Sequence, residues 1–216
     1  MRNAFLPPPD DVPCAGWPRL RSPLFQDYCT YVGIDERISL CEYKDGYYYY
    51  SITLQADETP LVVCALDQYI TDNLNQEAGR RCDYLCMGWY NGECFIAFVE
   101  LRKEMDVEEH FSNKFDQVKQ TIELLCRENV IFGNSLHQNV PRILNRACDP
   151  IEPHRIIGMI IPAIHSTSKA EQSRIAPIEG NGNVPIVVIP NRILREGETT
   201  WSKLMEKAVP NRNWEF

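Results

Sequence analysis

The fold is decided by RCDYLCMGWYNGECFIAFVELRKEMD, residues 81–106, where two apolar runs flank the dipeptide Asn91-Gly92. This dipeptide is the strongest short-range signal for a two-residue type I′ turn between antiparallel strands. A regular turn fixes the register of the whole hairpin, because each residue on one strand then has a defined partner on the other. We therefore expect residues 82–87 and 95–102 to be antiparallel neighbours.

The two strands of this hairpin are apolar on both faces. In the expected register Asp83 lies directly opposite Glu100 on the same face, with Cβ atoms about 4.5–5.5 Å apart. Leu85, Met87, Ile96 and Phe98 share that face, and Tyr84, Cys86, Ala97 and Val99 occupy the other. A hairpin covered on both sides is a central pair of strands, as in sheets that lie between layers of helices.

A helical period replaces the alternation after Met105. Apolar residues then recur at spacings of three and four, at Val107, Phe111, Phe115, Val118, Ile122 and Leu125. This spacing predicts an amphipathic helix that buries these side chains against the sheet. Asp106 precedes the helix and is suited to be its N-cap.

The other elements complete one domain of the α/β class, a mixed central β-sheet flanked by helices. Apolar or β-branched runs predict strands at residues 47–54, 61–65, 155–164 and 184–189, and a short helix is expected at residues 199–208. Pro185 and Pro190 favour an edge position for the last strand, because proline cannot donate to a ladder. Prolines crowd residues 1–23, which predicts an N-terminal arm ahead of a single domain over residues 24–216.

The composition bears on the cellular location of the protein, on the state of its cysteines and on its binding partners. No stretch resembles a signal peptide or a membrane span, which predicts a cytoplasmic protein without a membrane partner. The nine cysteines are irregularly spaced, and Cys64, Cys86 and Cys94 lie within apolar runs, which favours free buried thiols. The formal net charge of −8 predicts no strongly basic surface. Nucleic acid and a protein both remain candidate partners, but avid nonspecific DNA binding is not expected.

Two carboxylates opposed across a central sheet repel each other, and a bound cation offsets this repulsion. Mg²⁺ or Mn²⁺ suits such a pair, because these ions take oxygen ligands and are commonly held by one or two carboxylates with water and substrate phosphate. Asp83 and Glu100 are therefore candidate metal ligands. The alternative is that both acids lie at strand ends near Arg81 and Arg102 and form solvated or paired surface charges.

Three short segments, taken in order, resemble a known family. CDYL at residues 82–85, VELR at residues 99–102 and QVKQTI at residues 117–122 are similar to the CDYL, VELK and QLxxTI segments of uncharacterised bacterial proteins related to the PD-(D/E)xK nucleases. The resemblance covers roughly residues 62–190 and implies a restriction-endonuclease-like core. It also implies that Mg²⁺ is held by the first acid and the glutamate, that a lysine two residues later acts on the attacking water, and that a helix glutamine supports the site. By position these residues are Asp83, Glu100, Arg102 and Gln117.

Arg102 is the departure from this pattern, which calls for lysine. An arginine stays protonated and cannot serve as a general base, although it can stabilise developing phosphate charge. Three alternatives follow: a bulge brings Lys103 to the site, the site works without a lysine, or the site is inactive. The leading hypothesis is a metal-dependent nuclease-like hydrolase of phosphodiester bonds, and the second is an inactive nuclease-fold protein that binds or regulates a protein partner.

Overall fold

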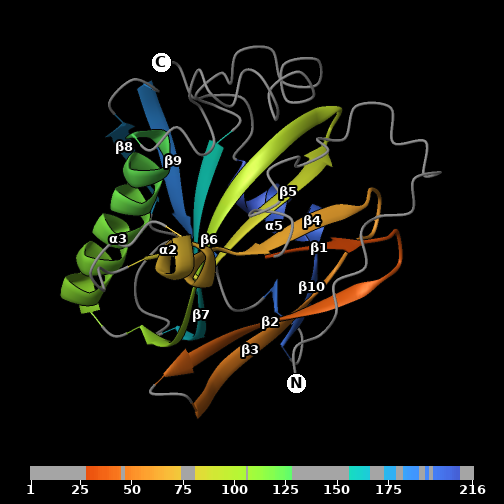
Figure 1. The fold of residues 1–216 in the computed structure, drawn as a ribbon, viewed down its shortest axis with the longest axis horizontal. Helices are drawn as coiled ribbons and strands as arrows, with labels where there is room; N and C mark the ends of the chain where they lie inside the picture. The colour runs from red at the N-terminus through yellow and green to blue at the C-terminus, as the bar shows by residue number, and fades with distance from the viewer. Residues whose placement is uncertain are drawn as a thin grey trace.

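The computed structural model describes residues 28–44, 47–73, 81–105, 107–127, 156–165, 173–178, 182–189, 193–194 and 197–209. Its centre is a seven-stranded sheet in the order β1-β4-β5-β6-β7-β9-β8 (Figure 1). The strands are β1 (Cys29–Val32), β4 (Leu61–Ala65), β5 (Tyr84–Tyr90), β6 (Glu93–Met105), β7 (Ile156–His165), β8 (Ser173–Ile178) and β9 (Gly182–Val188). The pairs β6–β7 and β7–β9 are parallel and the other pairs antiparallel. The expected mixed α/β sheet is confirmed, while the expected arm at residues 1–23 lies outside the described residues.

A second sheet packs against the first. It has three strands in the order β10-β3-β2, where β2 is Arg37–Lys44, β3 is Tyr47–Gln55 and β10 is Glu198–Thr200. The Tyr84 hydroxyl joins the two sheets, because it accepts a hydrogen bond from the Cys41 amide at 2.8 Å and donates one to the Cys41 carbonyl at 2.9 Å. Strand β2 is thereby held close to the end of β5.

The central hairpin has the predicted register. Strand β5 pairs with β6 from Tyr84 opposite Val99 to Tyr90 opposite Glu93. Asn91 and Gly92 form the turn with φ values of 51° and 79°, the positive φ angles that a type I′ turn requires. The regular ladder stops at Tyr84, so Asp83 lies one residue before the strand and is not a ladder partner of Glu100.

Helices cover both faces of the large sheet. On one face lie α2 (Leu66–Asn73) and α3 (Val107–Arg127), and on the other lies α5 (Trp201–Ala208) beside the second sheet (Figure 1). Three apolar residues of α3 are fully buried as predicted, namely Val118, Ile122 and Leu125. Phe115 is only partly buried, at the edge of the same core. The side chains of Val107 and Phe111, and the expected cap Asp106, lie outside the described residues.

The C-terminal helix α5 begins directly after β10. Thr200 caps it, because its side chain accepts a hydrogen bond from the Lys203 amide. Trp201 is buried and donates from Nε1 to the Trp89 carbonyl at 2.9 Å, which fixes the helix against β5. None of the described helices has the length and apolar character needed to cross a membrane.

Two further expectations require correction. Strand β9 is not an edge strand, because β8 pairs along its other side, with Ile175 opposite Pro185, and itself forms the edge. Cys64 is not a free thiol, because the unpredicted strand β1 places Cys29 directly opposite it and the two form a disulfide. Among the described cysteines, Cys41, Cys82, Cys86 and Cys94 are not disulfide-bonded.

The close packing of α3 on the sheet at Gly158 predicts the effect of Gly158→Ala. A Cβ at this position of β7 would lie 2.6 Å from Val118 Cγ1 and 2.8 Å from Ile186 Cγ1. We expect the substitution to destabilise the fold by about 1–3 kcal/mol, the usual range for overpacking a core. Chemical denaturation measures this, and the double variant Gly158→Ala/Val118→Ala should show a favourable coupling of at least about 0.5 kcal/mol. A Gly158→Ala protein as stable as the wild type would show that α3 does not pack here as described.

Candidate functional site

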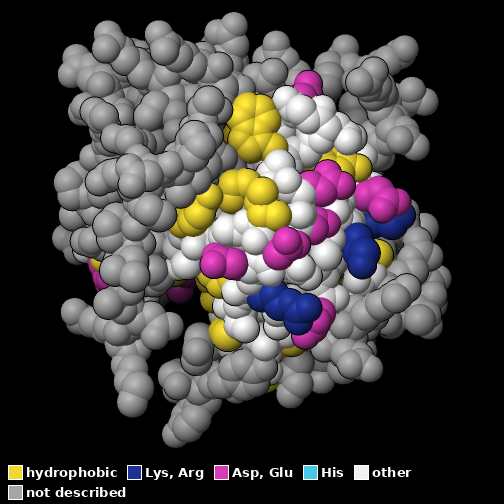
Figure 2. All heavy atoms as spheres, turned by 90° about the vertical axis from the view of Figure 1, so that its right-hand side faces the viewer, with side chains coloured by type: hydrophobic (Ala, Val, Ile, Leu, Met, Phe, Trp, Pro, Cys, Tyr) yellow, Lys and Arg dark blue, Asp and Glu magenta, His cyan; other side chains and the backbone are white. Residues whose placement is uncertain are grey.

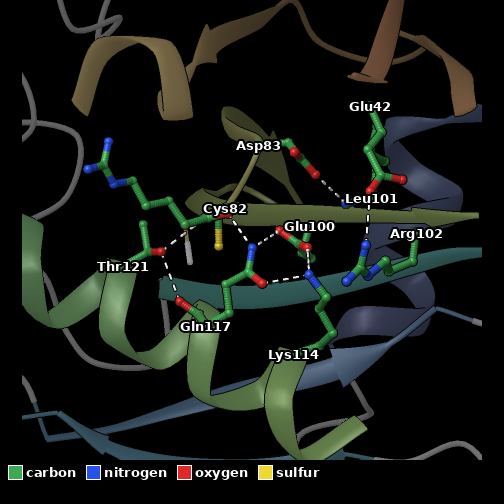
Figure 3. A network of polar contacts seen from close by, with 10 residues as sticks. Glu42, Cys82, Asp83, Glu100, Leu101, Arg102, Lys114, Gln117 and Thr121 are labelled. Carbon is green, nitrogen blue, oxygen red and sulfur yellow. Dashed lines mark hydrogen bonds and ion pairs between the residues drawn. The ribbon is translucent and has the colours of Figure 1, made fainter. Parts of the chain in front are cut away.

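Glu100 lies in the middle of the large sheet, on the part of β6 that extends beyond β5. It is opposite Ile160 of the parallel strand β7. The side chain is 2% exposed and points toward α3 (Figure 3). There Lys114 Nζ donates to Glu100 Oε1 at 2.5 Å, and Gln117 Nε2 donates to Glu100 Oε2 at 2.7 Å. Both carboxylate oxygens therefore have a donor from the helix.

One stripe of α3 carries the donors. Lys114, Gln117 and Thr121 follow one another at spacings of three and four, so they share a face of the helix. Lys114 Nζ also donates to Gln117 Oε1 at 2.5 Å, and Gln117 Nε2 donates to the Arg81 carbonyl. Thr121 Oγ1 accepts from the Cys82 amide at 3.0 Å. The helix is thus tied both to Glu100 and to the chain that leads into β5.

Asp83 is held at the end of the β5–β6 ladder. Its Oδ2 accepts a hydrogen bond from the Leu101 amide at 2.7 Å, and its carbonyl accepts from the Leu66 amide at 2.9 Å, at the start of α2. The ladder stops at Tyr84, so the side chain supplies the acceptor that a longer β5 would have offered to the Leu101 N–H. In Figure 3 Asp83 points to the β6 backbone, whereas Glu100 points to α3.

Arg102 forms a salt bridge to the second sheet, and its charge also lowers the pKa of Glu100. Its NH1 lies 3.1 Å from Glu42 Oε1 on β2, in a salt bridge whose side chains are 36% and 10% exposed, respectively. The other oxygen, Glu42 Oε2, is buried without a hydrogen-bond partner in the described part of the chain. Arg102 therefore links the two sheets.

Burial sets the protonation of both acids. It raises the pKa of Glu100 from 4.5 to about 7, although the adjacent Lys114 ammonium lowers it. Burial also raises the pKa of Asp83 well above its usual value, and the charge of Glu100 raises it further. The charge of Glu100 therefore disfavours the ionised form of Asp83.

The donor set suits a small divalent cation. Asp83 Oδ1 has no hydrogen bond within the described residues, and Glu100 retains lone pairs beside its two donors. Carboxylate oxygens are the ligands that Mg²⁺ and Mn²⁺ prefer, and one or two of them suffice when water and phosphate complete the shell. In the part of the chain that is described, no group of three His, Cys, Asp or Glu side chains is arranged to hold a metal ion.

Of the four sequence-predicted site residues, the structure brings Glu100 and Gln117 into direct contact. Asp83 lies at the neighbouring backbone, Arg102 is engaged elsewhere, and the side chain of Lys103 lies outside the described residues. Sequence reasoning missed Lys114. Its signal was its position three residues before Gln117, which places both side chains on one face of the helix.

Comparison of the chain with protein-family models, with curated proteins and with solved structures gave no match.

Proposed function

We propose that this protein is a metal-dependent nuclease with a restriction-endonuclease-like core, and that it hydrolyses phosphodiester bonds in nucleic acid at Asp83 and Glu100. The observation that carries the proposal is the setting of Glu100, a buried carboxylate in a central strand that is contacted by both Lys114 and Gln117. Carboxyl groups whose pKa values are shifted by burial and by neighbouring charges are typical of functional sites. The sequence order of acid, glutamate and helix glutamine agrees with the same class.

Each residue of the site would have its own role. Asp83 and Glu100 would hold Mg²⁺ or Mn²⁺, which when bound polarises a phosphate and lowers the pKa of water. Gln117 fixes the orientation of the Glu100 carboxylate through Nε2 and is itself anchored to the Arg81 carbonyl. The Leu101 amide fixes Asp83 in the same way. A site whose carboxylates are held rigidly loses little entropy when it binds an ion and a phosphate.

A second candidate is an inactive protein of the same fold that binds a protein partner. Two observations favour it: both oxygens of Glu100 already have donors, and Arg102 is occupied by Glu42. Figure 2 shows the right-hand side of the view in Figure 1, where acidic side chains gather on the described surface with fewer basic ones beside them, and this also favours a protein partner. A net charge of −8 likewise predicts weak binding of a polyanion.

A cleavage assay tests the proposal. Labelled single-stranded and double-stranded DNA and RNA are incubated with the wild-type protein at low ionic strength, where a weak polyanion interaction is strongest. We expect shortened products with Mg²⁺ or Mn²⁺ and none with a chelator. Glu100→Gln protein purified in the same way controls for contaminating nucleases. If the wild type cleaves none of these substrates with either ion at millimolar concentration, the hydrolase proposal fails and the binding protein takes its place.

A further inference from the structure

In this chain an arginine stands at the position where the nuclease pattern has a lysine. Arg102 is bound to Glu42 of the second sheet, and its guanidinium is not within hydrogen-bond distance of Glu100 among the described contacts. The hydrogen bond that the structure describes for the Arg102 guanidinium therefore goes to Glu42 and not to Glu100. The cation beside Glu100 comes instead from the helix, at Lys114.

We propose that Lys114 is the positioning cation of the site, the role that the pattern assigns to the residue two positions after the glutamate. This inference rests on the proposed nuclease function and deepens it. It depends on contacts that join different parts of the chain, with Lys114 on α3 and Glu100 on β6.

The surroundings of Lys114 are those of a site residue and not of an ordinary helix surface lysine. Its side chain is 10% exposed, and Nζ lies 2.5 Å from both Glu100 Oε1 and Gln117 Oε1. Burying an ammonium is costly unless it is paired, and these two oxygens provide the pairing. Lys119, further along α3, is partly exposed and lies 3.7 Å from Glu123 in a surface pair.

The ammonium has one donor left for a ligand. A lysine ammonium carries three N–H groups, and Glu100 and Gln117 occupy two of them within the described residues. The third is available to a phosphate oxygen or to a water molecule held by one. Lys114 would act as a charged donor that orients and stabilises the phosphate, which requires no change in its protonation.

The same charge has a second effect that can be measured without turnover. A positive charge 2.5 Å from Glu100 Oε1 opposes the binding of a cation to that carboxylate. Removing it should therefore tighten metal binding while slowing cleavage. A lysine that only supports the fold would not change these two properties in opposite directions.

The test compares Lys114→Met, Arg102→Lys and the control Lys119→Met. For Lys114→Met we expect kcat to fall at least about tenfold with KM changed less than about threefold, because the lost contact acts in the transition state. Calorimetry should show Mn²⁺ binding at least about threefold tighter. Arg102→Lys and Lys119→Met should stay within about threefold of the wild type in kcat. Circular dichroism checks the fold, and Lys114→Gln, which keeps N–H donors without the charge, replaces Lys114→Met if that variant does not fold.

The outcomes separate this inference from the proposed function. Cleavage by the wild type together with unchanged kcat in Lys114→Met would overturn the role of Lys114 alone. A rise in kcat of about tenfold or more in Arg102→Lys would also overturn it, because the missing cation would then belong at residue 102. Absence of cleavage by the wild type would overturn both. Slower cleavage with tighter Mn²⁺ binding in Lys114→Met would support it.

Discussion

Glu100→Gln and Asp83→Asn are each expected to reduce metal-dependent cleavage at least about 100-fold, a loss of about 2.7 kcal/mol of transition-state stabilisation. Each amide keeps the size of the side chain but lacks the charge that holds a cation. The amide oxygens can still accept from the donors that fix the acids, the Lys114 ammonium for Glu100 and the Leu101 amide for Asp83. The variants should therefore keep the fold, with a lower stability in Glu100→Gln because its amide nitrogen cannot accept from Gln117 Nε2.

The matched control is Glu123→Gln. This residue lies on α3 as a partly exposed member of a surface pair with Lys119. It removes the same charge from the protein, so any general effect of net charge on nucleic-acid binding appears in the control as well. Initial rates at saturating substrate give the comparison. Equal rates for the wild type and Glu100→Gln would mean that the cleavage arises elsewhere.

The second large effect concerns the pH dependence of stability. The pKa of Glu100 is about 7 in the folded protein, against 4.5 for an unperturbed glutamate in the unfolded chain. A raised carboxyl pKa contributes stability that is fully present below about 4.5 and is lost as the pH rises through about 7. Between about pH 5 and pH 8 the wild type should thus lose about 2–3 kcal/mol through this group.

Charged neighbours from several elements act on this titration. Lys114 on α3 and Arg102 on β6 lower the pKa of Glu100, whereas Glu42 on β2 raises it. The raised pKa of Asp83 adds a loss of the same sign over its own titration range. The wild type should therefore show a decline in stability toward pH 8 that exceeds the contribution of Glu100 alone.

Glu100→Gln isolates the contribution of Glu100. The amide does not titrate, so the fall in stability between about pH 5 and pH 8 should shrink by about 2–3 kcal/mol relative to the wild type. The comparison concerns the change between the two pH values, because the variant also leaves the Lys114 ammonium without a carboxylate at both. Urea unfolding with a chelator present measures it, and Glu123→Gln should keep the wild-type change. Parallel pH profiles for the wild type and Glu100→Gln would show that Glu100 is not buried as described.

The hairpin and the long helix could be predicted because their signals are local. Asn91-Gly92 sets the register by turn geometry, and the apolar spacing from residue 107 onward sets the face of α3. The site was only partly predictable from the same pattern. Asp83 is not part of the ladder, and its carbonyl accepts hydrogen bonds from the amides at the start of α2. The apolar spacing of the segment that forms α2 did not predict a helix.

The remaining features depend on contacts between segments far apart in sequence. Lys114 and Glu100 are in contact only because α3 folds back on β6. Arg102 forms its salt bridge with Glu42, which lies on a strand of the second sheet that was not predicted. The expectation that β9 is an edge strand was wrong because the prolines do not prevent pairing along the whole strand. A proline lacks only its N–H, and β8 can still pair with that strand around Pro185.

The claim that Asp83 and Glu100 together hold a divalent cation is tested most directly by calorimetric titration of Mn²⁺ into the protein at about pH 8, above the raised pKa of Glu100. We expect saturable Mn²⁺ binding at millimolar or lower concentration to the wild type and to Glu123→Gln, and no binding to Asp83→Asn or Glu100→Gln. Absence of binding to the wild type, or the same affinity in all four proteins, would contradict it.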